Sequence, residues 1–158
     1  MINKHYRLAA RPQGMVKASD FQYGEAPVPP VGDGEVLVKI LYISLDPAMR
    51  GWMNEGKSYI PPVGIGEVMR AGTLGEVIES KNPAYKPGDF VVGNDGVQSY
   101  AVSAGKGYHK VDPKLAPLPK YIGALGMPGM TGYFGLLETG APKAGETVVV
   151  SGAAGAVG

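Results

Sequence analysis

The sequence predicts a barrel-like β domain followed by the start of an α/β nucleotide-binding domain, within 158 residues. Many short apolar runs, separated at regular spacing by Gly, Pro, Asn and Asp, indicate the β domain. Three consecutive valines before a glycine-rich run, in the segment VVVSGAAGAVG at 148–158, indicate the second domain. A chain of this length can hold one domain and a fragment of another. We therefore expect a mixed β and α/β fold.

Composition excludes several classes of protein. The formal net charge is +1 with the two signs interspersed, so no nucleic-acid partner is expected. The absence of cysteine excludes disulfides and thiolate metal sites, and His5 and His109 are the only histidines, so no metal is expected. No apolar run approaches membrane-spanning length, and the N-terminal segment lacks a signal-like apolar region. We expect a cytoplasmic protein without a membrane partner.

Turn-bounded apolar runs predict the strands of the first domain. These runs are His5–Ala10, Phe21–Pro29, Val36–Leu45, Ala71–Ser80, Phe90–Val92, Val97–Ser103 and Tyr108–Val111. The run VLVKILYISL at 36–45 is apolar at nearly every position, which predicts a core strand buried on both faces.

Two loop segments carry candidate ligand contacts. Arg50 and Trp52 follow the 36–45 strand, and Trp52 is the single tryptophan. We expect its ring to pack at a domain edge, with a platform for a ligand as the alternative. The segment NEGKSYIPPVGIG at 54–66 has no periodicity and is typical of a loop over a cleft. Tyr59 within it offers a hydroxyl to a substrate, or is an ordinary surface tyrosine.

The second part of the chain begins after a proline-rich linker, LAPLPK at 115–120, so we place the domains at 1–119 and 120–158. A helix is predicted over 121–125, and GMPG at 126–129 breaks it. A second helix is predicted over 130–138, started by Thr131 and ended by Gly140. Met127 and Thr131 lie at the break between the helices, where side chains either face a cleft or pack in a core.

The glycine-rich run is expected to follow a buried parallel strand and to turn sharply. It reads Ala153-x-Gly155-x-x-Gly158, a dinucleotide-binding fingerprint with alanine at the first glycine position. Gly155 would let the backbone approach a pyrophosphate, and Gly158 would let a following helix pack closely on the strand. An ordinary turn after a strand is the alternative.

Several motifs in order resemble the medium-chain dehydrogenase/reductase superfamily. They are SLDPAMRG, PPVGIGEVMRAGTLGEV, KPGDFVVG, LGMPGMTGYFGLLETG and KAGETVVVSGAAGAVG. The likeness is to its zinc-free branch of leukotriene B4 dehydrogenases, prostaglandin reductases and curcumin reductases. It implies a GroES-like β-barrel domain followed by the truncated start of an NADP(H)-binding Rossmann domain. It also implies hydride transfer to the carbon–carbon double bond of an α,β-unsaturated ketone or aldehyde, with these 158 residues inactive by themselves.

The resemblance assigns residues to two groups of contacts. The expected cofactor contacts are Met127 and Thr131 near the nicotinamide and Gly155, Ala156, Val157 and Gly158 at the pyrophosphate. The expected substrate contacts are Tyr59 and Tyr100, and no catalytic residue is assigned. Ala48 stands in the SLDPxMRG motif where relatives often carry tyrosine, which leaves any donor role of that motif open.

Two other functions stay open. One is a non-catalytic, crystallin-like member of the same fold that binds NADPH without turnover. The other is a methyltransferase-type α/β domain, whose glycine turn also follows a first strand but which does not need a long β-rich module. The expected partner is a small enone or enal, and a homodimer formed through the rest of the Rossmann domain is a further expectation.

Overall fold

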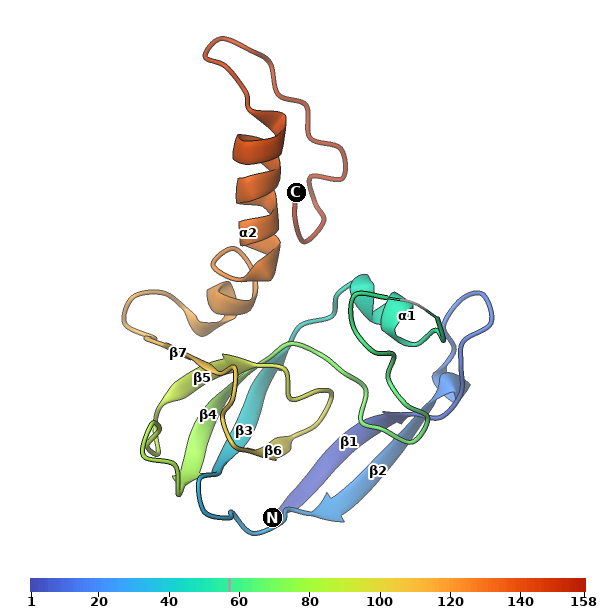
Figure 1. Ribbon diagram of the computed structural model, residues 1–158, viewed down its shortest axis with the longest axis vertical. Helices are drawn as coiled ribbons and strands as arrows, with labels where there is room; N and C mark the ends of the chain where they lie inside the picture. Colours follow the sequence, from blue (N-terminus) through green and yellow to red (C-terminus); the bar gives the residue numbers. More distant parts are fainter. Residues whose placement is uncertain (57) are drawn as a thin grey trace. The chain divides into compact units, whose positions relative to one another are not determined.

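The computed structural model describes residues 1–56 and 58–158 (Figure 1). The chain divides into two compact units, Met1–Val111 and Asp112–Gly158. The limit between functional domains after Pro119 stays a prediction. Within the described residues, no helix has the length and apolar character needed to cross a bilayer.

The regular structure of the first unit is mainly antiparallel strands, which confirms the predicted β-rich domain. Strand β1 (Ile2–Leu8) pairs with β2 (Phe21–Pro27) in a separate hairpin-like sheet. The second sheet has five strands in the order β6 (Tyr100–Ser103), β3 (Val36–Ile43), β4 (Thr73–Ser80), β5 (Phe90–Gly93) and β7 (His109–Val111). Isolated bridges from His5 to Gln98 and from Arg7 to Val68 connect β1 to the segments beside it.

Strand β3 is buried only in its first half, so the predicted burial along 36–45 is wrong for the second half. Val36 and Val38 are fully buried, whereas Leu41 and Tyr42 are 38% and 41% exposed. The ladder with β6 covers residues 36–39, so the later residues lose the neighbouring strand on that side. Leu41 and Tyr42 are therefore open to contact from elsewhere, whereas Ile40 and Ile43 pack partly against the core.

Two apolar clusters form the core of this unit. One contains Leu8, Met49, Met53, Val63, Met69 and Ala71, and joins β1 to helix α1 (Ala48–Trp52) and the segment after it. The other contains Val36, Val38, Val77 and Val91, and lies on β3, β4 and β5. Every member of both clusters is less than a tenth exposed, so strand pairing and apolar burial support one another here.

The second unit contains a 3-10 helix, Leu118–Ile122, and helix α2, Met127–Phe134, which continues as a π-helix over Gly135–Gly140 (Figure 1). The predicted helix over 121–125 is thus a 3-10 turn placed three residues earlier. The predicted start at Met130 is also wrong. Pro128 lies in the first turn of α2, where its missing N–H costs nothing, so GMPG begins the helix instead of breaking it. Thr131 is inside α2 and does not cap it.

The predicted strand at Val148–Val150 is not formed. These residues have no regular secondary structure, and Val149 is 88% exposed. A parallel strand needs a partner strand reached by a crossover, and no residue of 112–158, all of which the structure describes, lies in a strand. None of these residues is buried.

Candidate functional site

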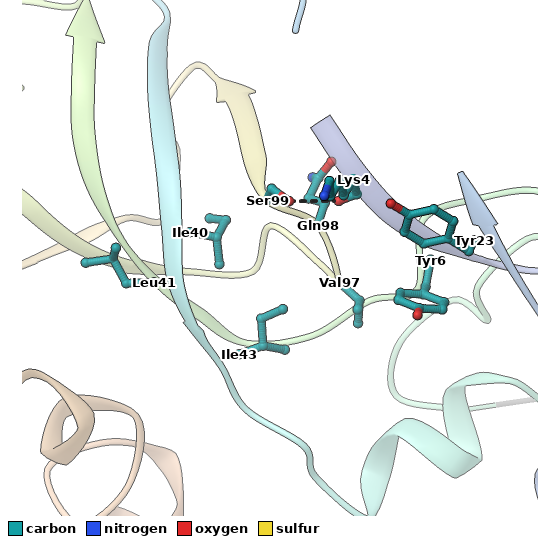
Figure 2. A pocket seen from close by; sticks show the side chains of 9 residues that line it. All are labelled: Lys4, Tyr6, Tyr23, Ile40, Leu41, Ile43, Val97, Gln98 and Ser99. Carbon is teal, nitrogen blue, oxygen red and sulfur yellow. Dashed lines mark hydrogen bonds between the residues drawn. The ribbon is translucent and has the colours of Figure 1, made fainter. Parts of the chain in front are cut away.

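An open pocket of about 370 Å³ lies in the first unit, beside the exposed half of β3 (Figure 2). Its lining residues come from β1, β2, β3 and the segment before β6: Lys4, Tyr6, Tyr23, Ile40, Leu41, Ile43, Val97, Gln98 and Ser99. Lys4, Gln98 and Ser99 lie close together in the upper middle of the view, with Val97 and Ile43 below them (Figure 2). This lining suits an apolar molecule that carries an oxygen acceptor.

The walls of the pocket are fixed by contacts between distant segments. The rings of Tyr6 and Tyr23 meet edge to face, with centroids 5.5 Å apart. The Ser99 hydroxyl donates to the Lys4 carbonyl at 3.3 Å, and the Ser99 amide donates to the same carbonyl at 2.9 Å. Sequence reasoning missed this pocket, because its residues are ordinary strand residues that only the tertiary pairing brings together.

A second cluster surrounds helix α1 and the loop after it. The Trp52 indole N–H donates to the Tyr59 hydroxyl at 3.0 Å, and the Arg70 guanidinium lies 5.6 Å from the centroid of the Trp52 ring. Arg50 donates to Asn54 at 2.5 Å and to the carbonyls of Pro12 and Gly14. Arg50 thus joins the end of α1 to a segment that lies 36 to 38 residues earlier in the chain.

The two predicted substrate residues lie in separate parts of the first unit. Tyr59 is 83% exposed in the loop after α1. Tyr100 is half-buried in β6, where its backbone N–H donates to the Asn3 side chain at 3.0 Å. No hydrogen bond or ring contact between described residues joins the two tyrosines. Their placement on one substrate stays a prediction.

A cluster of hydrogen-bonded polar side chains, which sequence reasoning missed, holds the turn before Val97. The Asp95 carboxylate accepts hydrogen bonds from the Tyr108 hydroxyl at 2.5 Å and from the Thr73 hydroxyl at 2.8 Å. Burial raises the pKa of Asp95, although these two hydrogen bonds act to lower it. Burial, followed by the nearby Asp95 carboxylate, also raises the pKa of Tyr108.

This polar cluster positions part of the pocket wall. The Asp95 carbonyl accepts a bond from the Gln98 side chain at 2.6 Å, and the Val97 amide donates to the Met69 carbonyl at 2.8 Å. Asn-Asp-Gly at 94–96 signals only a turn in the sequence. The partners Thr73 and Tyr108 are far from it along the chain, so no local pattern indicates the polar cluster.

The predicted cofactor residues all lie in the second unit. Met127 and Thr131 are one turn apart on α2, and the Thr131 hydroxyl donates to the Met127 carbonyl at 2.7 Å. Met127 is 78% exposed. The glycine run passes close to the same helix, because a Cβ added at Gly132 would be 3.1 Å from the carbonyl oxygen of Val157.

The backbone of the glycine run makes a tight turn that packs on itself. The Gly155 amide donates to the Gly152 carbonyl at 2.8 Å, which closes a tight turn. A Cβ added at Gly158 would lie 2.6 Å from both the Gly152 oxygen and the Ala153 Cα, so only glycine fits there. Close packing of the run's own backbone thus accounts for the glycine at 158, and contact of residues 155–158 with a pyrophosphate stays a prediction.

The described residues, 1–56 and 58–158, contain no group of three His, Asp or Glu side chains able to hold a metal ion. His5 is 6% exposed, and its ring accepts a hydrogen bond from Arg7 at 2.9 Å. That histidine is a structural partner of Arg7 and of the backbone at Gly24, which lies against its ring.

Residues 4–111 match the family model described as the N-terminal domain of oxidoreductase. The chain belongs to this family. The resemblance to the medium-chain dehydrogenase/reductase superfamily is thereby confirmed, and the first unit of the fold is its N-terminal oxidoreductase domain.

Relatives extend the similarity over nearly the whole chain. YfmJ of Bacillus subtilis (strain 168) is 49% identical over 152 residues, which cover 96% of this chain and 44% of YfmJ. The NADPH-dependent curcumin reductase of Escherichia coli (strain K12) is 45% identical over 161 residues, covering 99% of this chain and 45% of the reductase. The crystal structure of CurA from Vibrio vulnificus in complex with NADPH superposes with a TM-score of 0.90 at 41% identity, over 98% of this chain and 46% of CurA. The chain thus spans less than half the length of these three relatives.

Proposed function

We propose that residues 1–158 belong to an NADPH-dependent reductase of carbon–carbon double bonds conjugated to a carbonyl. The observation that carries this proposal is the similarity, over almost the whole chain, to the curcumin reductase of E. coli and to the NADPH complex of CurA. Curcumin contains such conjugated double bonds. The proposal includes α,β-unsaturated ketones and aldehydes as substrates, a cytoplasmic location and a homodimer as the working form.

The second unit would supply part of the NADPH site. We assign Gly155, Ala156, Val157 and Gly158 to the pyrophosphate, and Met127 and Thr131 to the nicotinamide. Bound NADPH supplies the hydride that reduces the double bond. The task of these residues is to hold the cofactor in place. Because Gly155 has no side chain, the phosphates could approach its backbone, and the exposed Met127 side chain offers an apolar contact to the nicotinamide ring.

The first unit would hold the substrate. Reduction at the β-carbon places negative charge on the carbonyl oxygen, and hydrogen-bond donors directed at that oxygen stabilise the charge. We assign this contact to Tyr59 and a supporting contact to Tyr100.

The test is turnover by the full-length reductase that contains this chain. With NADPH and curcumin, we expect NADPH consumption and a product whose conjugated double bond is saturated and whose carbonyl is retained. A saturated ketone of similar size serves as the control and should not consume NADPH. Binding of NADPH without turnover of any enone would refute the enzymatic function and favour the crystallin-like alternative.

A substitution in the glycine run tests the cofactor assignment. Gly155→Val places a branched side chain near the Gly152 oxygen, 3.1 Å from the new Cβ, and against the expected pyrophosphate. We expect the NADPH dissociation constant of the full-length protein to rise at least tenfold, about 1.4 kcal/mol. Gly135→Val is the matched control, because a Cβ at Gly135 meets nothing within 4 Å. Equal affinity in both variants would show that the run has no role at the phosphates.

A further inference from the structure

Trp52 and Tyr59 form a directed hydrogen bond in the loop after α1. The indole nitrogen of Trp52 lies 3.0 Å from the hydroxyl oxygen of Tyr59. An indole N–H can only donate, so the Tyr59 oxygen is the acceptor in this bond. The hydrogen of the Tyr59 hydroxyl is then left to donate elsewhere. Since Tyr59 is 83% exposed, that hydrogen is accessible to a bound molecule.

The Trp52 ring is held in place on several sides. It packs against the apolar cluster that contains Met49, Met53 and Val63. The Arg70 guanidinium lies over the ring at 5.6 Å, and the same guanidinium donates to the Pro61 carbonyl at 2.9 Å. A half-buried, stacked ring has few rotamers open to it, so its N–H points in a fixed direction.

The loop that carries Tyr59 is tied back to Trp52. The Val63 amide donates to the Trp52 carbonyl at 2.8 Å, which closes the loop at its far end. Arg70 holds Pro61, between Tyr59 and Val63, through the bond described above. Trp52 thus contacts the loop through its carbonyl and its indole N–H.

We infer that Trp52 is a positioning residue, which holds the Tyr59 hydroxyl as a hydrogen-bond donor to the carbonyl oxygen of the substrate. The inference rests on the proposed function. Tyr59 keeps its proton and makes no covalent bond; it stabilises the charge that develops on the oxygen when the double bond is reduced. A tyrosine without this partner could turn its hydroxyl to accept or donate, and part of its population would be unproductive.

Two substitutions separate this role from simple support of the loop. Trp52→Phe removes the N–H donor and keeps an aromatic ring for Arg70 and the apolar cluster. Tyr59→Phe removes the hydroxyl and keeps the ring. Both variants preserve most of the packing, so loss of fold is not expected to explain their effects. Tyr42→Phe is the matched control, because Tyr42 is an exposed tyrosine of β3 outside this cluster.

The hydrogen bond itself is tested without any activity. Trp52 is the single tryptophan, so the proton–nitrogen NMR spectrum of the 158-residue chain contains one indole N–H signal. We expect Tyr59→Phe to shift this signal and to speed its exchange with solvent, whereas Tyr42→Phe leaves it in place. An indole signal that is the same in wild type and Tyr59→Phe would overturn the inference.

The role in the reaction is tested in the full-length reductase with an enone. We expect Trp52→Phe and Tyr59→Phe each to lower kcat by about tenfold, with KM changed by less than about twofold. Since both remove one function, the double variant should be no slower than Tyr59→Phe alone. Normal kcat in Trp52→Phe, or losses that multiply in the double variant, would overturn the positioning role. A third outcome is that Tyr59→Phe shifts the indole signal while the wild-type full-length protein reduces no enone. That result would refute the proposed function, and the role of the Tyr59 hydroxyl in the reaction with it.

Discussion

Both units of the chain carry large apolar side chains, but only the first unit buries them. Leu8 and Leu74 in the first unit are fully buried, while Leu136 and Leu137 in the second are 43% and 44% exposed. The first unit gains its core from strands that are distant in sequence, such as β3 and β6. The second has helical periodicity without a partner surface among its own residues.

This difference shows that an apolar repeat predicts which face of a helix or strand is suited to burial. It does not show that a partner surface is present to bury that face. Met130, Tyr133, Phe134 and Leu137 recur at helical spacing, yet all are at least 44% exposed. Helical stability in proteins comes mainly from packing of the apolar face. The second unit of the 158-residue chain should therefore be the less stable one.

The largest expected effect separates the two units by a leucine truncation in each. Leu8→Ala removes a side chain that is 0% exposed and should lower the free energy of unfolding by about 2–5 kcal/mol. Leu137→Ala should change it by less than about 0.5 kcal/mol, because its side chain is near half exposed. Urea unfolding of the 158-residue chain, followed by fluorescence of Trp52 in the first unit, measures the cost of Leu8→Ala. Helical circular dichroism during the same titration measures the cost of Leu137→Ala in the second unit. Similar costs would contradict the comparison.

A glycine-to-alanine substitution in each unit should change stability by a smaller amount, with a loss of stability in the first unit and a gain in the second. A Cβ at Gly75 would lie 2.6 Å from the Lys39 carbonyl oxygen of the neighbouring strand, so Gly75→Ala should destabilise the first unit by about 1–3 kcal/mol. Gly135→Ala meets nothing within 4 Å and should stabilise its helix by about 0.5–1 kcal/mol. Urea unfolding tests Gly75→Ala, and helical circular dichroism on heating tests Gly135→Ala. An unchanged urea midpoint for Gly75→Ala would show that β3 and β4 can separate at no cost.

The smallest effect is a dependence of the first unit's stability on pH. Burial raises the pKa of Asp95, so the folded state keeps this proton to higher pH than the unfolded chain does. The stability that results is full below the unfolded-state pKa and is lost as pH rises through the raised pKa. Asp95→Asn should flatten this part of the profile of urea midpoint against pH. The exposed Asp33→Asn is the control, and equal profiles for wild type and Asp95→Asn would contradict the assignment.

The β-rich architecture could be predicted because its signals are local. Turn residues such as Pro87-Gly88-Asp89 bound short apolar runs, and each predicted run of the first domain contains an observed strand or most of one. Burial along β3 could not be predicted, since it depends on where the ladder with β6 ends. The strand expected at Val148–Val150 failed for a related reason: a parallel strand forms only with a partner.

The candidate site was less accessible to sequence reasoning. The glycine run could be proposed because phosphate turns have a local pattern. Met127 and Thr131 were proposed at a break between helices, which the structure shows to be the first turns of α2, and the contact of all these residues with a cofactor stays a prediction. The bond between Trp52 and Tyr59 joins two residues that the sequence singled out separately, and only the fold of the loop pairs them. The polar cluster of Asp95, Thr73 and Tyr108 cannot be recognised in any short stretch of sequence, because its three members come from separate segments.

The most direct test of the central claim follows the hydrogen atom that is transferred. The full-length reductase is incubated with an α,β-unsaturated ketone and NADPH that carries deuterium at the transferable position of the nicotinamide. We predict one deuterium at the β-carbon of a saturated ketone, detected by NMR of the product. Deuterium at the carbonyl carbon of an alcohol, or no transfer to any enone, would contradict the claim that this chain belongs to a double-bond reductase.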